Sequence, residues 1–357
     1  MTRTAICYCH HVSHALNLCE IPSLLIDRGW QVRWFNAFPA ESFPFPLDPR
    51  IEYVFGAPQQ SVGVQHADLY LSPLVGQSEN FPRHAIRVHF LVSLTSIEGV
   101  YDKTMFDHYD VIACAGRHQI DDFLQLGHER QWRNKTLIPL GYPKLDLQRR
   151  QLSNSKKRGA NEALTVVFAP THSYYINNSF SVLRNYGETI IETLIGSGIS
   201  VIFRPHVESW RDQDKTITEG IVSRFGQHPL FSLDRSGNYF ESYAKSDLMI
   251  TDISGTGFTY AFTFGQPALF FAPNPQHEFG KSGIQFERRE NIGLVIRNLK
   301  DLTARILLAH KHIAFLSKQI DEYRDWLLFN LGCSELYFSD HAHHLLDNKA
   351  SNDWIRF

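Results

Sequence analysis

Cysteine is scarce in this chain, and its arrangement suits neither a metal centre nor a disulfide framework. The five cysteines among 357 residues form no C-x-x-C pair and no Cys/His set with zinc spacing. Cys7, Cys9 and Cys114 lie inside apolar stretches, which favours small buried thiols in a reducing compartment. A structural zinc site and a disulfide-stabilised secreted scaffold are therefore not expected.

Strong charge and long apolar runs are missing as well. The formal net charge is −2 and the pI is about 6.8, whereas proteins that bind nucleic acid non-specifically are usually basic. No stretch reaches the ~18 apolar residues of a membrane-spanning helix, and no signal-peptide pattern is expected at the N-terminus. The composition predicts a cytoplasmic globular protein without a nucleic-acid partner, which meets a membrane only from its surface.

The sequence does contain two arrays of short apolar strands that alternate with helical stretches. The first array has strands over 5–9, 31–36, 51–55, 68–71, 86–91, 110–115 and 136–140, and the second over 164–169, 199–204, 230–233, 247–251 and 268–271. Strands separated by helix-length connections form parallel sheets that are covered on both faces.

A polar segment, 148–162, separates the two arrays and indicates a linker, because it has no apolar periodicity. We expect an acceptor-side domain over 1–150 and a donor-binding domain over 151–357, which closes with two helices, over 299–313 and 320–330. Two Rossmann-like α/β domains facing a cleft are typical of the GT-B architecture, whose ligands bind at the carboxyl ends of the strands.

The most informative cluster follows the buried strand at 247–251. A turn of small and hydroxyl-bearing residues leads from Asp252 into a helix. Helix N-termini offer unpaired N–H groups to a pyrophosphate, so Asp252, Ser254, Gly255 and Thr256 are candidate donor-binding residues; Ser254 or Thr256 can also simply cap the helix. Neither G-x-x-x-x-G-K-[ST] nor G-x-G-x-x-G occurs here, so a P-loop NTPase and a dinucleotide oxidoreductase are not indicated.

Two further strand ends in the second array carry an imidazole. Pro170, Thr171 and His172 follow one strand, and Arg204 and His206 follow another. A guanidinium suits bidentate contact with phosphate. A lone histidine at a strand end is usually structural, but two at equivalent positions favour a functional reading, so these residues are candidates for binding the donor.

The first array adds polar residues of less certain meaning. In the run GYPKLD, Gly141 and the proline predict a turn that presents Lys144, and a mere exit from the domain fits the pattern equally well. His89 ends a strand where an imidazole can take a proton from an acceptor hydroxyl, although a core histidine is the simpler interpretation of that residue alone.

A second imidazole-rich loop, with His10, His11 and His14, follows the first strand. It is the other place in this array from which a base can come.

In this order, the runs GYPKLD, FAPTH, FRPH and SDLMITDISGTGF, followed by GQPALFF, resemble the CDP-glycerol glycerophosphotransferase family of teichoic-acid and capsule polymer synthases. The likeness spans roughly 89–292, and an N-x-G-x-S element at 330–334 adds to it. The resemblance implies a GT-B transferase that moves a polyol phosphate from a CDP-linked donor to a polysaccharide or lipid-linked acceptor. It also implies a peripheral enzyme at the inner membrane face that needs neither metal nor other cofactor.

The resemblance assigns roles to individual residues as well. His89 matches the family's base, and His206, with Arg204 beside it, matches the histidine expected on the donor phosphates. Two positions depart from the family's pattern: Phe90 stands where a glycine follows the base, and Thr259 replaces an acid that often holds the donor ribose. These departures leave the nucleotide open.

Two other functions stay possible at this point. The first is a GT-B glycosyltransferase that uses a nucleotide sugar, because the fold is shared. The second is a non-catalytic scaffold of a polymer-synthesis complex. Because the resembled family acts on lipid-linked acceptors, we expect contact with the membrane through the Phe-rich segment 38–45 or through a basic helix face; that segment is either a packed loop or a membrane foot.

Overall fold

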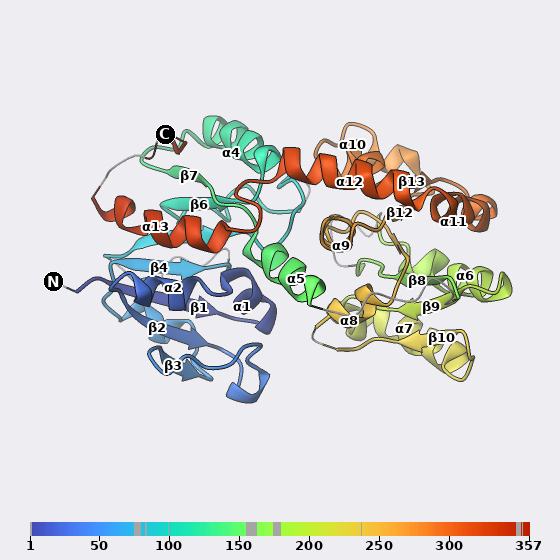
Figure 1. Ribbon diagram of the computed structural model, residues 1–357, viewed down its shortest axis with the longest axis horizontal. Coiled ribbons are helices and arrows are strands. Elements are labelled where there is room, and N and C mark those ends of the chain that lie inside the picture. Colours follow the sequence, from blue (N-terminus) through green and yellow to red (C-terminus); the bar gives the residue numbers. More distant parts are fainter. Residues whose placement is uncertain are drawn as a thin grey trace. The chain divides into compact units, whose positions relative to one another are not determined.

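The computed structural model describes residues 2–74, 80–82, 84–98, 100–154, 163–173, 180–236, 238–347, 351 and 353–357. The chain forms two compact units. Unit 1 comprises Met1–Val92, Tyr101–Leu147 and Leu327–Phe357, and unit 2 comprises Ser93–Val100 and Gln148–Trp326. In Figure 1, helices flank the strands of each unit.

Unit 1 is built on a sheet with the strand order β14-β7-β6-β5-β4-β1-β2-β3. All of its strand pairs are parallel except that of β14 with β7. The strands are β1 (Thr4–Cys9), β2 (Gln31–Asn36), β3 (Glu52–Phe55), β4 (Leu69–Ser72), β5 (Ile86–Phe90), β6 (Val111–Cys114), β7 (Thr136–Pro139) and β14 (Ile355–Arg356).

The helices of unit 1 cover a sheet whose two faces are both apolar. They are α1 (Val12–Leu18), α2 (Ile21–Asp27), α3 (Gln60–Gly63), α4 (Arg117–Arg130), the start of α5 (Pro143–Ser153) and α13 (Ser334–Leu346). Alternation along β1 sends Cys7 and Cys9 into one core, and Ile6 and Tyr8 into the core on the other face. This burial on both faces explains why the strand reads as a continuous apolar run.

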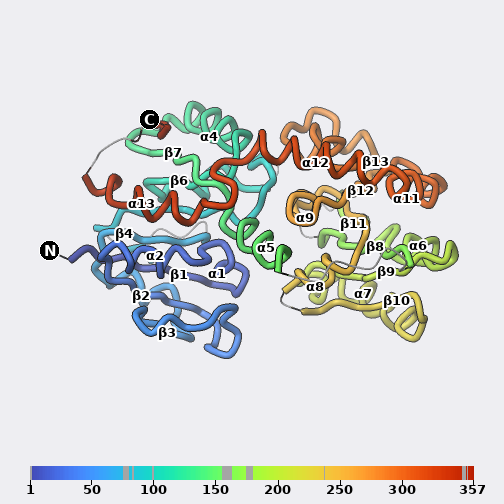
Figure 2. The backbone as a smooth tube through the Cα atoms, in the orientation of Figure 1, coloured from blue at the N-terminus to red at the C-terminus, as the bar shows by residue number. Residues whose placement is uncertain are grey.

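The C-terminal segment of the chain returns to unit 1. Helix α13 lies beside α2, as the red and blue traces in Figure 2 show, and β14 extends the sheet at β7. On the sequence alone, this segment is expected in a domain over 151–357. The structure differs because Asp146 accepts hydrogen bonds from the backbone N–H groups of Gly332 (2.8 Å) and Ser334 (3.1 Å), which tie the segment to the start of α5.

Unit 2 is a doubly wound sheet with the strand order β10-β9-β8-β11-β12-β13, and all of its pairs are parallel. Numbered within the unit, the order is 3-2-1-4-5-6, so the topological switch point falls between β8 and β11. The strands are β8 (Thr165–Phe168), β9 (Ser200–Phe203), β10 (Phe231–Leu233), β11 (Leu248–Thr251), β12 (Ala268–Phe271) and β13 (Gly293–Ile296).

The helices of unit 2 are α6 (Leu183–Gly196), α7 (Asp212–Phe225), α8 (Phe240–Ala244), α9 (Thr256–Phe264), α10 (Ile284–Glu287), α11 (Leu302–Lys311) and α12 (Ile313–Leu327), the last of which ends at the boundary with unit 1. None of the helices in the described ranges is long and apolar enough to cross a bilayer.

The polar segment and the closing helices differ from the sequence prediction. Residues 148–153 continue α5, which begins at Pro143, a favoured first helical residue; 155–162 lie outside the described residues. Three helices, α11, α12 and α13, stand where two closing helices were predicted. The helical stretch breaks after Lys311 and again between Leu327 and Ser334.

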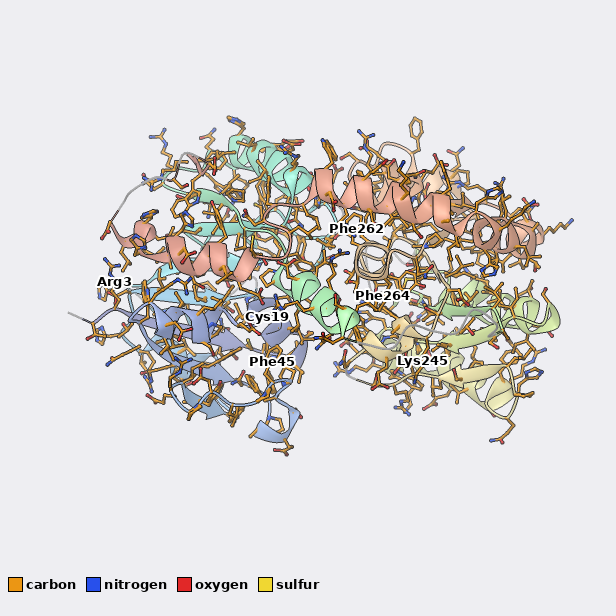
Figure 3. The ribbon with its side chains drawn as sticks, in the orientation of Figure 1. Arg3, Cys19, Phe45, Lys245, Phe262 and Phe264 are labelled. Atoms are coloured by element: carbon orange, nitrogen blue, oxygen red, sulfur yellow. The ribbon has the colours of Figure 1, made fainter. Side chains whose placement is uncertain are left out.

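The Phe-rich segment packs onto unit 1 and does not project from it. Phe38 is buried, and Phe43 and Phe45 are partly buried against the same core; Figure 3 labels Phe45. Phe43 meets Trp34 edge-on, with ring centroids 5.0 Å apart. These contacts favour a packed loop, the alternative to a membrane foot, because the rings are used in packing.

Candidate functional site

The turn between β11 and α9 is shaped by two glycines. A Cβ on Gly255 would lie 2.3 Å from Ser93 Oγ, and a Cβ on Gly257 would lie 3.0 Å from the Phe270 ring. Both residues therefore let neighbouring segments approach more closely than a side chain allows. Ser254 Oγ accepts a hydrogen bond from the Thr256 N–H at 3.3 Å, so it occupies one N–H group at the start of α9, although the N-cap position itself is Gly255.

Helix α9 begins at Thr256. Its N-cap residue is Gly255, which has no side chain that could bond to the first N–H groups of the helix. Because α9 follows a strand at the switch point, its positive dipole end lies where doubly wound sheets bind phosphorylated ligands.

Asp252 holds two strand-end loops of unit 2 together. Its carboxylate accepts hydrogen bonds from the Thr171 backbone N–H (2.9 Å) and hydroxyl (2.6 Å). Burial raises the pKa of Asp252, while these bonds and those from the backbone of Val182 and Ile253 lower it. Asp252 and Thr171 therefore position the site, and Pro170 beside them is buried.

Arg204 is fixed in place at the end of β9. Its guanidinium pairs with Asp234 at 2.6 Å, donates to the Ser236 carbonyl at 3.1 Å, and lies 5.5 Å from the centroid of the Tyr239 ring. Burial alone would raise the pKa of Asp234, but hydrogen bonds from Ser236 and Ser242 and the charge of Arg204 bring it below its usual range. The pair presents a rigid, partly buried guanidinium.

His206 is an exposed imidazole whose tautomer is set by the backbone. Its Nδ1 accepts a hydrogen bond from the Glu208 N–H at 3.2 Å, which leaves the proton on Nε2 when the ring is neutral. The pKa of His206 is lowered to about 4, first by desolvation and then by His172 and Arg204. The His172 ring lies 4.5 Å away, and burial lowers its pKa too. With Nδ1 occupied by the Glu208 N–H, Nε2–H is the group that His206 presents as a donor.

A hydroxyl-bearing segment that sequence reasoning missed lies against the turn between β11 and α9. Ser93–Val100 belongs to unit 2, and Ser93 Oγ lies 3.0 Å from Thr95 Oγ1. Ser96 fixes the segment, because its N–H donates to Gln285 Oε1 at 3.0 Å. The signal was the run of hydroxyl residues, Ser-Leu-Thr-Ser, directly after the strand that contains His89.

His89 lies inside unit 1. It is 1% exposed, and its ring packs against Phe106 and Tyr109, with centroids 5.3 and 4.8 Å away. Burial lowers the pKa of His89 to about 3, and His14 and Lys135 act in the same direction. No acceptor hydroxyl can reach this ring in the observed conformation, so its burial counts against the predicted role of base.

Neither ring nitrogen of His89 makes a hydrogen bond of ordinary geometry within the described part of the chain. The backbone of Ser72, its partner on β4, lies close enough to favour the protonated form slightly.

Gly141 and Lys144 lie at the start of α5, where Gly141 closely approaches the C-terminal segment of unit 1. Gly141 has φ +94°, and a Cβ there would lie 2.4 Å from the Phe329 carbonyl oxygen. Lys144 lies in the first turn of α5 and is 8% exposed. The predicted turn is thus the start of a helix, and its residues contact the C-terminal segment.

The other imidazole loop of unit 1 is accessible. His10 and His11 are exposed, with ring centroids 4.5 Å apart. His14 accepts from the His10 N–H through Nδ1 at 3.4 Å. The pKa of His14 is lowered to about 3 by desolvation and by its neighbours His11, His10 and Lys144. Among the described residues, no group of three or more His, Cys, Asp or Glu side chains is arranged to hold a metal.

The doubly wound parallel sheet of unit 2 is of the kind from which GT-B folds are built. The sequence matches the family described as CDP-Glycerol:Poly(glycerophosphate) glycerophosphotransferase over residues 102–327. The chain belongs to this family, as its sequence motifs predicted, and it is a transferase of the glycerophosphotransferase type. No curated protein matches the sequence.

Solved structures share the fold. The wall teichoic acid polymerase TagF is 14% identical, with a TM-score of 0.64 over 98% of this chain and 90% of that one. A variant of TagF soaked with CDPG gives a TM-score of 0.65 at 13% identity, over the same shares of the two chains.

The UDP-GlcNAc 2-epimerase of Methanocaldococcus jannaschii, in complex with UDP-GlcNAc and UDP, is 10% identical, with a TM-score of 0.59 over 95% of this chain and 99% of that one. At these identities the likeness supports the GT-B fold and no individual residue role.

Proposed function

We propose that this protein transfers a polyol phosphate from a CDP-linked donor to a polysaccharide or lipid-linked acceptor in the synthesis of a teichoic-acid-type polymer. The observation that carries the proposal is the shared position of three anion-binding groups in unit 2. The start of α9, Arg204 and the Nε2–H of His206 all follow carboxyl ends of parallel strands, where a pyrophosphate binds in folds of this kind.

The reaction then needs little covalent chemistry from the protein. The acceptor hydroxyl attacks the β-phosphorus of the donor, an O–P bond forms, the bond to the α-phosphate oxygen breaks, and CMP leaves. Negative charge grows on the phosphate oxygens, and Arg204, His206 and the α9 N–H groups stabilise it. We propose that these groups suffice without a metal ion.

The proton of the acceptor hydroxyl must go to a base. Because the ring of His89 is buried, we assign the base to the exposed pair His10 and His11 in the loop after β1. An imidazole can act as a general base toward a hydroxyl. His14 is less suited, because the structure holds its Nδ1 as an acceptor within the loop.

Association with the inner membrane face belongs to the same proposal. Phe315 and Trp326 on α12 are 68% and 58% exposed. They stand eleven residues apart and so share one face of the helix. This face replaces the Phe-rich segment as the proposed contact with the lipid surface. Changing both to Ser should reduce flotation with anionic liposomes, whereas Phe279→Ser, another exposed aromatic, should not.

The central test is a panel of CDP-, UDP- and GDP-linked donors, incubated with a lipid-linked acceptor extract, in which nucleotide release is followed. CMP release from CDP-glycerol or CDP-ribitol is expected. Release of UDP or GDP instead would favour a glycosyltransferase. Tight nucleotide binding without any release in the presence of acceptor would favour the non-catalytic scaffold.

A further inference from the structure

Unit 2 contains a hollow that none of the proposed phosphate contacts uses. It has a volume of about 80 Å³ and lies at the carboxyl ends of β11 and β12, beside the start of α6. Asp252 and Ile253 bound it on one side, Asn274 on another, and Asn185 and Tyr186 on the side of α6.

The carboxylates of the hollow are already engaged. Asp252 accepts hydrogen bonds from Thr171, with contacts of 2.9 and 2.6 Å. Glu278 accepts from two guanidinium nitrogens of Arg289 at 2.8 Å and pairs with Arg297 at 2.8 Å. The charge of Glu278 is thus balanced by two arginines and the Asp252 carboxylate is held by hydrogen bonds, and neither group attracts an anion.

The uncommitted polar groups are two neutral amides. Neither Asn185 nor Asn274 makes a side-chain hydrogen bond to any residue in the described part of the chain. A primary amide offers two donors and one acceptor, which matches hydroxyl groups. The rest of the lining combines the Tyr186 and Phe271 rings, 5.1 Å apart, with the polar side chains of Ser181 and His277. Together they suit a neutral group with C–H faces and several hydroxyls.

Size and position narrow the ligand further. A single water needs about 10–15 Å³ of such space, so 80 Å³ accommodates a group of about half a dozen heavy atoms and not a nucleoside. The hollow begins at Asp252 and Ile253, directly before the Ser254–Thr256 turn. Arg204 and Tyr239 follow β9 and β10, which lie on the other side of the switch point.

We propose that this hollow binds the polyol end of the donor, with Asn185 and Asn274 contacting its hydroxyls. The inference rests on the proposed function, because it places the pyrophosphate at the start of α9. The transferred group then lies on the β12 side of the turn and the nucleoside on the β9–β10 side. Asn185 and Asn274 are thus specificity residues for the polyol and not for the nucleotide.

The test compares the affinities of CDP-glycerol and CDP by calorimetry for the wild-type protein, Asn185→Ala, Asn274→Ala and the double variant. Each single change should weaken CDP-glycerol binding about 3- to 10-fold, the scale of one lost hydrogen bond, and the double change by roughly the product. The affinity for CDP, which has no polyol, should stay within about twofold. Gln276→Ala, an exposed amide of the same loop outside the hollow, is the matched control and should change neither.

Unchanged CDP-glycerol affinity in the double variant would overturn the assignment of the hollow alone. Equal losses for CDP and CDP-glycerol would overturn it in favour of the nucleoside. If the wild-type protein binds neither compound, the CDP-linked donor of the proposed function falls, and the polyol assignment falls with it. All three side chains are exposed, so thermal melting should confirm that every variant folds like the wild type.

Discussion

In unit 1 the imidazole at the end of β5 is enclosed by Phe106 and Tyr109, whereas in unit 2 the imidazole at the end of β9 reaches solvent. The same contrast holds for the charged side chains: Asp146 is buried and bonded to the C-terminal segment, and Lys144 is buried too, while Arg204 is fixed with its guanidinium partly open. Both units place polar residues after buried strands, so this pattern alone does not identify a ligand site. A polar residue at a strand end is a structural clamp where a later segment of the chain covers it, and it can bind a ligand where no segment does.

The largest effect expected from this contrast is that of His206→Ala in unit 2. Removing a neutral Nε2–H donor from the phosphates should lower kcat/KM by about 10²-fold or more and weaken nucleotide binding. Steady-state rates and calorimetry with CDP-glycerol would measure both.

His228→Ala is the matched control for that change. Its Nδ1 accepts from the Leu230 N–H at 3.2 Å, as that of His206 does from Glu208, but it precedes β10 and should leave the rate unchanged. Equal losses in the two variants would show that the imidazole acts through its backbone hydrogen bond and not on the donor.

A smaller, purely structural effect is expected from Asp146→Ala in unit 1. The change leaves the Gly332 and Ser334 N–H groups without their carboxylate, and it should lower the free energy of unfolding by about 2–4 kcal/mol. Nucleotide affinity of the folded protein should be retained. Urea denaturation and calorimetry would show this, and Asp146→Asn, which keeps an acceptor oxygen, should restore part of the stability. Loss of nucleotide binding at full stability would return the GYPKLD run to the donor site.

His89 makes the free energy of unfolding of unit 1 depend on pH. Its pKa is about 3 in the folded protein and about 6.5 when unfolded, so the unfolded state takes up the proton first as pH falls. The stability held by the neutral ring is complete above pH 6.5 and is lost progressively toward pH 3, by about 1.4 kcal/mol per pH unit.

The leucine variant of His89 tests this pH dependence and the base together. Between pH 6.5 and 5, His89→Leu should reduce the slope of unfolding free energy against pH by up to about 1.4 kcal/mol per pH unit, the contribution of one proton. Activity at pH 7 should persist. Urea denaturation at several pH values would measure the slope. A rate loss of ~10²-fold or more at full stability would restore His89 as the base, and the comparable loss would then be absent from His10→Ala and His11→Ala.

The smallest effect is expected from removal of metal ions. Activity should stay within about twofold after EDTA treatment, since the proposed reaction assigns phosphate charge to Arg204, His206 and helix N–H groups. Coupled measurement of CMP release before and after chelation would test this. A complete loss that Mg²⁺ or Mn²⁺ restores would contradict the metal-free proposal.

The strands and the family were predictable because their signals are local. Buried runs such as Leu248–Thr251, followed by a glycine-containing turn, specify a strand, a turn and a helix within a few residues. The start of α5 carried a signal too, since proline favours the first helical position, but the proline was interpreted as part of a turn. The candidate groups of unit 2 were chosen for the same reason: each follows the end of a strand.

What the sequence did not reveal depends on distant segments. The burial of His89 requires Phe106 and Tyr109, which precede the next strand, and the membership of 327–357 in unit 1 requires the bonds of Asp146 to Gly332 and Ser334. Ser93 and Asn185 were overlooked because nothing near them in sequence places them against the Gly255 turn or the hollow. Such contacts have no local periodicity.

The return of the chain to unit 1 has a consequence for biosynthesis. During translation, every strand of unit 2 emerges from the ribosome before β14 does, although β14 completes the sheet that β1 began. Until then β7 is an open edge, a hazard for pairing with other chains. The order of synthesis therefore favours a nascent chain in which unit 2 is folded and the edge of unit 1 is still unprotected, the stage at which chaperones would be of most use.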